Sequence, residues 1–97
     1  MGKFYRLVGH KVKPCSAMEI NWGLDRAVAL TRIGKADIST VFLPVNHQLS
    51  GDDPPLIFET MIFGGIHDGY QTRYSTWEDA KAGHTKAVNL VKSRKVK

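Results

Sequence analysis

Two short, strongly apolar segments place the narrowest limits on how this chain can fold. They span residues 38–45 and 56–63, and a polar loop over residues 46–55 lies between them. Each segment is short for a buried helix and is bounded by turn-forming residues, which favours a strand. We therefore predict two strands whose side chains are too apolar for either strand to have a fully solvated face.

The N-terminal third of the chain predicts one strand and one helix. Alternating side chains over residues 3–9 are typical of a strand, and residues 9–14 are expected to be a connector. Ser16 and Glu19 have the spacing of a capping box, which predicts a short helix over residues 17–25.

The rest of the chain predicts a hairpin and a long helix. Residues 27–33 are compatible with a strand that pairs with the segment 38–45 through a tight turn. Ser75 and Glu78 form a second capping box ahead of a helix over residues 76–93. Its apolar stripe consists of Trp77, Ala80, His84, Val88 and Val91.

Together these elements predict a single α+β domain over residues 1–97, with the order β-α-β-β-β-α. We expect a four-stranded, mainly antiparallel sheet in which the first strand is the fourth member. The C-terminal helix should pack on one face of this sheet, and residues 93–97 should form a frayed basic tail. Because a single helical layer leaves the other apolar face open, we expect a homo-oligomer that buries it.

Charge, cysteine content and hydropathy indicate the charge of the partner and the cellular compartment. The net charge of +5 favours an anionic partner. The single Cys15 cannot form an internal disulfide, which favours a cytoplasmic protein. The N-terminus lacks the apolar core of a signal peptide, and no apolar run approaches the roughly 20 residues that span a bilayer, so we expect no membrane association.

Glu59 is the most unusual candidate, because it stands between apolar residues in the middle of a predicted strand. A buried carboxylate requires a cation or strong hydrogen-bond donors. One hypothesis is a structural ion pair, with Arg26, Arg32 or Arg73 as the partner. The other is a ligand pocket that Glu59 shares with a neighbouring arginine.

Arg73 and Tyr74 immediately precede the last helix, whose free N–H groups and dipole favour a phosphate. The competing interpretation is that Tyr74 and Trp77 are a hydrophobic anchor and that Ser75 is only the helix cap. The four histidines lack zinc-ligand spacing, although His47, Asp52 or Asp53, and His67 remain an alternative metal site. We expect no metal and no cofactor, and His84 is expected to be a core histidine with one hydrogen bond.

The chain resembles a group of short proteins encoded by bacteriophages and by bacteria that carry prophage-like genes. The pattern covers most of the chain, and Phe58-Glu-Thr-Met61 is its most specific part. The chain departs from it at Pro44-Val45-Asn46, where glycine and an aspartate are usual. The matching residues are Gly9-His10, Pro14-Cys15, Ser39-Thr-Val-Phe-Leu43, His47, Pro55-Leu-Ile-Phe-Glu-Thr-Met-Ile-Phe-Gly-Gly65, Arg73-Tyr74, Thr76-Trp77-Glu78, Ala80 and Gly83-His84.

The resemblance implies a context rather than an activity. Small phage proteins often inhibit host systems, and one class sequesters the nucleotide messengers of antiphage signalling. The leading hypothesis is therefore a non-catalytic protein that captures a small anionic, nucleotide-like ligand. Its candidate contacts are His10, Ser39, Thr40, His47, Glu59, Arg73 and Tyr74.

Three alternatives remain open. A protein-interaction or structural phage accessory would use the apolar sheet face for a partner. A metal-dependent hydrolase would use His47 and nearby acids. A nucleic-acid-binding protein is less favoured, and it would use Lys3, Arg6, Lys11, Lys13 and the C-terminal cations.

Overall fold

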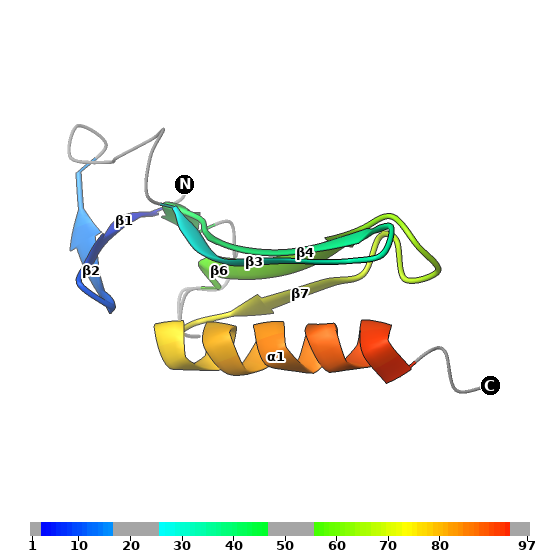
Figure 1. Ribbon diagram of the computed structural model, residues 1–97. Coiled ribbons are helices and arrows are strands. Elements are labelled where there is room, and N and C mark those ends of the chain that lie inside the picture. Colours follow the sequence, from blue (N-terminus) through cyan, green and yellow to red (C-terminus); the bar gives the residue numbers. More distant parts are fainter. Residues whose placement is uncertain (1–2, 17–25, 47–55, 94–97) are drawn as a thin grey trace.

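The computed structural model describes residues 3–16, 26–46 and 56–93. These residues form two antiparallel sheets and one helix (Figure 1). The larger sheet has the strand order β3-β4-β6-β7, and the smaller has the order β2-β1-β5. The bounds are β1 Lys3–Val8, β2 Lys11–Cys15, β3 Ala27–Ile33, β4 Ala36–Phe42, β5 Val45–Asn46, β6 Phe58–Phe63, β7 Gln71–Tyr74 and α1 Trp77–Ser93.

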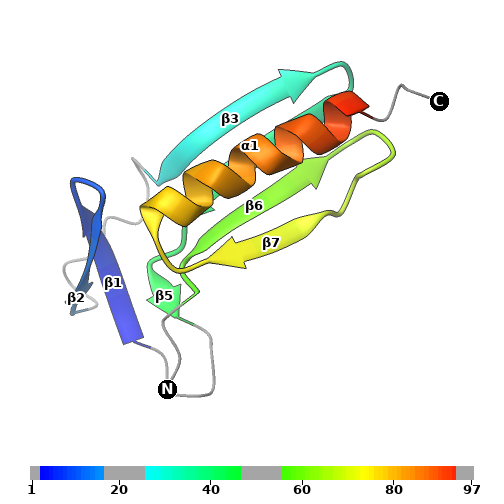
Figure 2. The same ribbon diagram turned by 90° about the horizontal axis from the view of Figure 1, so that it is seen from below.

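Helix α1 covers one face of the larger sheet and runs along its strands (Figure 2). The helix begins after Thr76, whose Oγ1 accepts a hydrogen bond of 3.0 Å from the N–H of Asp79. Thr76 is therefore the N-cap, one residue later than the predicted Ser75. Glu78 and Asp79 lie in the first turn, where carboxylates stabilise the positive end of the helix dipole.

The predicted α+β class, the four-stranded antiparallel sheet and the C-terminal helix on one face are confirmed. The predicted identity of the fourth strand is wrong. That position belongs to β7, which pairs with β6 through a local hairpin, whereas β1 pairs with β2 and β5 in the smaller sheet. A hairpin partner close in sequence forms more readily than a distant strand, because the loop to be closed is shorter.

Two further predictions concern the N-terminal region. Residues 9–14 were expected to be a connector, but most of them belong to β2. Pro14 is tolerated there because β2 is an edge strand of its sheet, where a missing N–H breaks no interior ladder. The helix predicted over residues 17–25 lies outside the described residues.

Side chains between α1 and the larger sheet form two apolar clusters with a polar layer between them. The first cluster contains Ala36, Ile38, Ile62, Ala87 and Val91, and the second contains Phe42, Ile57, Phe58 and Ala80. Along β4, β6 and α1, the buried polar residues Thr40, Thr60 and His84 stand between the members of the two clusters.

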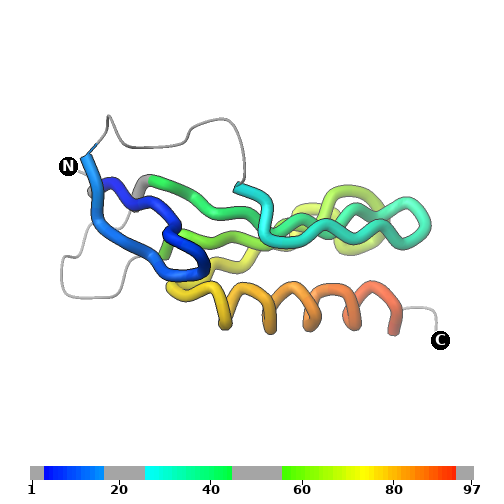
Figure 3. Tube along the Cα trace, turned by 60° about the vertical axis from the view of Figure 1, so that its left-hand side comes forward, coloured from blue at the N-terminus to red at the C-terminus, as the bar shows by residue number. Residues whose placement is uncertain are grey.

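Different elements lie beside the two ends of helix α1. The β1–β2 hairpin lies near the start of α1, and the turns β3–β4 and β6–β7 lie near its other end (Figures 2 and 3). Tyr5, Leu7 and Val12 of the smaller sheet pack on the second cluster. We call the region of the β3–β4 turn, the β6–β7 loop and the last turn of α1 the hairpin end.

Candidate functional site

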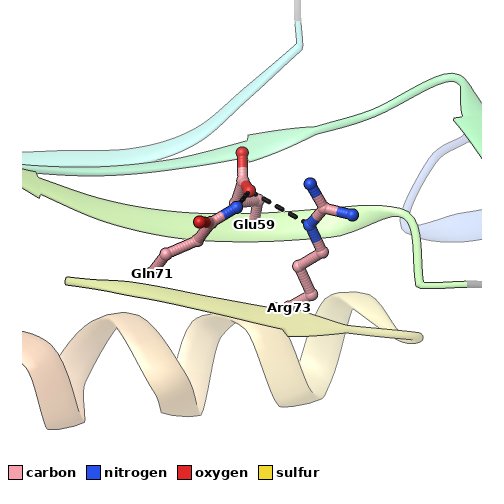
Figure 4. A network of polar contacts seen from close by, with 3 residues as sticks. All are labelled: Glu59, Gln71 and Arg73. Carbon is pink, nitrogen blue, oxygen red and sulfur yellow. Dashed lines mark hydrogen bonds and ion pairs between the residues drawn. The ribbon is translucent and has the colours of Figure 1, made fainter. Parts of the chain in front are cut away.

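Glu59 lies on the face of the larger sheet that points away from α1 (Figure 4). Arg73 is its direct partner across strands β6 and β7, and the Arg73 Nε donates to Glu59 Oε2 at 3.1 Å. The side-chain amide of Gln71 donates to the same oxygen. Glu59 is 9 % exposed, and these donors offset the loss of water around its carboxylate.

This geometry selects Arg73 among the three arginines expected as partners of Glu59. Arg32 instead pairs with Asp37 at 3.5 Å on the exposed surface. The Arg73 side chain remains 39 % exposed. Ser39 lies on the same face of the sheet, since it alternates with the buried residues Ile38 and Thr40. Neither of the cavities described below is lined by Glu59, Ser39 or Arg73.

Tyr74 lies on the opposite face from Arg73, because successive residues of a strand alternate in direction. Its ring packs on the second apolar cluster and lies directly over Gly83 of α1, where a Cβ would overlap the ring. Tyr74 thus anchors β7 to the helix. The proposed phosphate contact and base-stacking contact are therefore separated by the thickness of the sheet.

Thr40 belongs to a buried hydrogen-bonded layer rather than to a surface pocket. Its hydroxyl contacts the Thr60 hydroxyl and lies 2.7 Å from Nδ1 of His84. The other ring nitrogen, Nε2, lies 2.9 Å from Oγ1 of Thr31. His84 is thus a core histidine as expected, but it has two hydrogen bonds. Burial lowers the pKa of His84, and the charge of nearby Lys81 lowers it further.

His10 lies at the opposite end of the molecule from the hairpin end and stacks on Trp77. The two ring centroids are 3.9 Å apart, and the rings are within 7° of parallel. A shallow cavity of about 220 Å³ adjoins this pair and is lined by His10, Lys11, Val12, Ser75, Thr76, Trp77 and Glu78. The carboxylate of Glu78 in this lining disfavours a phosphate at the helix N-terminus.

Four of the cations considered for a nucleic-acid contact lie on the smaller sheet. Arg6 and Lys13 are direct partners across β1 and β2, and both are exposed, as is Lys11. The fourth, Lys3, begins β1. His47, another candidate contact, lies outside the described residues, as do Asp52 and Asp53.

A second cavity, about twice the volume of the one beside His10, lies at the hairpin end and measures about 430 Å³. It is lined by Ile33, Gly34, Lys35, Ala36, Gly64, Gly65, Ile66, His67, Val91 and Lys92. We call it the hairpin-end cavity. Of the seven residues expected to contact a ligand, the six that the structure describes do not line it.

Backbone geometry at two glycines shapes this cavity. Gly64 and Gly65 have φ values of 88° and 76°, which L side chains rarely adopt. A Cβ at Gly64 would overlap the carbonyl oxygen of Lys35, so the β6–β7 loop approaches the β3–β4 turn as closely as only glycine permits. The Gly64 N–H donates to Oδ1 of Asp68 at 2.7 Å, which fixes the loop.

The sequence signal for this cavity is the pair Gly64-Gly65, which directly follows the apolar segment 56–63. This pair lacks the spacing of a phosphate-binding loop, and its role is to let the β6–β7 loop approach the β3–β4 turn. Across the described ranges, no three His, Cys, Asp or Glu side chains cluster closely enough to hold a metal ion. Within the same ranges, no helix has the length and apolar character needed to cross a bilayer.

Comparisons with protein families, with curated proteins and with solved structures gave no match.

Proposed function

We propose that this protein is a small-molecule-binding protein that captures an anionic ligand at the hairpin-end cavity and does not alter it chemically. The observation that carries the proposal is the cavity itself. Its volume of about 430 Å³ falls within the range of about 300–1,000 Å³ that is usual for small-molecule sites. Its mostly apolar wall with few polar groups is also typical of such sites.

The charge of the lining supports an anion. Lys35 in the β3–β4 turn and Lys92 in the last turn of α1 both line the cavity. None of the described lining residues is acidic, so these charges are not neutralised within the lining. Two cations beside an apolar wall attract a negatively charged group and repel a cation.

Nucleotides remain one ligand class within this proposal. The resemblance to phage-encoded proteins implies that capture would lower the free concentration of a host signalling molecule. The proposal includes a cytoplasmic setting, which is supported by the single Cys15 and by the absence of cysteine pairs in the sequence.

A thermal-shift screen of anionic compounds tests the proposal. The panel contains cyclic dinucleotides, ADP-ribose derivatives, nucleoside monophosphates and aliphatic carboxylates. A ligand at about 100 times its Kd stabilises the folded state by about 2.7 kcal/mol. For a chain of this size, that raises the Tm by about 10 °C or more. If no anion in the panel raises the Tm, the proposal is wrong.

A matched pair of charge reversals locates the binding site. Lys92→Glu places a carboxylate beside the cavity, and we expect it to remove most of the ligand-induced shift. Lys86→Glu makes the same change at another exposed position of α1 that does not line the cavity. We expect Lys86→Glu to retain the shift. Equal loss in both variants would mean that binding reflects overall charge rather than this cavity.

A further inference from the structure

The wall of the hairpin-end cavity favours an aliphatic ligand body over a nucleotide base. Ile33, Ala36 and Val91 belong to the first apolar cluster or pack against it, and they continue into the cavity wall. Ile66 adds an apolar side chain that is 67 % exposed. The described lining offers no Phe, Tyr or Trp ring for base stacking and no Asn or Gln amide to recognise a base edge.

The polar groups of the cavity are few, and all suit one acidic head group. Lys35 and Lys92 supply positive charge, with alkyl stems that can cover apolar surface. His67 also lines the cavity, and its Nε2 is buried without a hydrogen-bond partner among the described residues. An unpaired buried nitrogen is uncommon in folded proteins and calls for a partner. A ligand oxygen entering beside His67 would supply one.

The size of the cavity limits the ligand to one small molecule. A volume of about 430 Å³ is near the lower end of the usual range for ligand sites. A phospholipid with two long acyl chains exceeds this volume, whereas a single medium-length chain does not. We therefore consider a free molecule rather than a lipid held in a membrane.

We infer that the hairpin-end cavity binds a free medium-chain aliphatic carboxylate, with the chain against Ile33, Ala36 and Val91. The carboxylate lies between Lys35 and Lys92 and accepts a hydrogen bond from His67. This inference rests on the proposed function and specifies the ligand class of the same site. It requires no covalent step.

Isothermal titration calorimetry with a homologous series tests the inference. The probes are butanoate, hexanoate, octanoate and decanoate, all below their micelle concentrations. Because the chain becomes buried, we expect each added CH₂ to tighten binding by about fourfold until the cavity is full. Decanol has the same chain without the charge, and we expect it to bind about tenfold more weakly than decanoate. Decyltrimethylammonium, with the opposite charge, should not bind.

A matched pair of variants checks the location. Ile66→Glu places a carboxylate at the exposed rim of the cavity, and we expect a loss of decanoate affinity of about tenfold or more. Val8→Glu is the same kind of change at another exposed apolar residue, in β1, which does not line the cavity. We expect Val8→Glu to bind decanoate normally. The Tm of both variants without ligand, measured first, shows that they are folded.

The outcomes separate this inference from the proposed function. If a nucleotide binds and no carboxylate does, the ligand class is wrong and anion capture stands. If neither binds, both are wrong. If decanoate binds with the same affinity in wild type and Ile66→Glu, the site lies elsewhere. Binding only to vesicles that contain phosphatidylglycerol, with no affinity for free decanoate, would overturn the inference in favour of a membrane lipid.

Discussion

At the scale of residues, the layer of Thr31, Thr40, Thr60 and His84 shows how polar groups are accommodated inside this small core. A neutral imidazole has one donor and one acceptor nitrogen, and each threonine hydroxyl can both donate and accept. The contacts of Nδ1 with Thr40 and of Nε2 with Thr31 can therefore be satisfied in either neutral tautomer. Protonation would add a charge with no carboxylate partner among the described residues in this layer.

The lowered pKa of His84 predicts a specific pH dependence of stability. In the unfolded chain His84 takes up a proton near pH 6.5, whereas the folded protein resists protonation until a lower pH. Between these two pKa values the unfolded state binds more protons, so the free energy of unfolding falls as the pH falls below about 6.5. The slope from this one group is at most about 1.4 kcal/mol per pH unit.

Urea unfolding of wild type and His84→Gln between pH 8 and pH 5 measures this contribution. Other titrating groups are shared, so the difference between the two proteins isolates His84. We expect wild type to have a stability advantage above pH 6.5 that shrinks as the pH is lowered. A difference that stays constant across this range would contradict the assignment.

At the scale of elements, the sequence was informative where a pattern was long and uninterrupted. The apolar runs predicted β4 and β6, and the helical stripe predicted α1 nearly to the residue. The short strands β2 and β7 were missed, since β7 is largely polar and β2 contains Pro14. Tertiary pairing outweighed these weak local preferences.

The candidate site was harder to predict than the fold. The hypothesis of a structural ion pair included Arg73 among three possible partners of Glu59, and this partner is confirmed. The hairpin-end cavity was not predicted, because a turn, a loop and a helix end that are distant in sequence create it together. The position of Tyr74 over Gly83 also depends on how closely α1 approaches the sheet, which no local pattern reveals.

The contact between β7 and α1 predicts an unusual effect of Gly83→Ala. Within an exposed helix this change normally stabilises by about 1 kcal/mol. Here the new methyl group would overlap the Tyr74 ring, so we expect a loss of about 1–3 kcal/mol in the free energy of unfolding. Chemical denaturation measures the change.

Two companion variants serve as controls for Gly83→Ala. Ala82→Gly, at the neighbouring exposed position, reports the ordinary helix propensity and should lose about 1 kcal/mol. Adding Tyr74→Leu to Gly83→Ala should recover part of the loss through relief of the overlap. Stabilisation by Gly83→Ala alone would show that Tyr74 moves aside without cost.

At the scale of the whole molecule, one face of the larger sheet lacks a covering layer in the described part of the chain (Figure 1). This face contains Leu30, which is 72 % exposed, and Phe63, which is 50 % exposed, next to the ion pairs of Glu59 and Arg32. Exposed large apolar side chains on an uncovered sheet face favour a surface that binds another protein. The homo-oligomer stays a prediction, and we expect its subunits to contact each other through this face.

We expect light scattering coupled to size-exclusion chromatography to give a mass above the 10.8 kDa of one chain for wild type at micromolar concentrations. Leu30→Arg should shift the protein towards a monomer, because burying a leucine contributes about 1.5–3 kcal/mol. Val8→Arg, at an exposed apolar position of the smaller sheet, should leave the mass unchanged. A wild-type mass of one chain at these concentrations would contradict the prediction.

The polar layer in the core also determines where the helix lies along the sheet. Apolar contacts alone would allow α1 to pack at several positions along the strands, because such contacts are not directional. Sliding the helix by one turn would separate His84 from Thr31 and Thr40 and leave their polar atoms without partners. The hydrogen-bonded layer of the three threonines and His84 thus fixes the position of α1 along the sheet. It selects one alignment among several that would bury a similar amount of apolar surface.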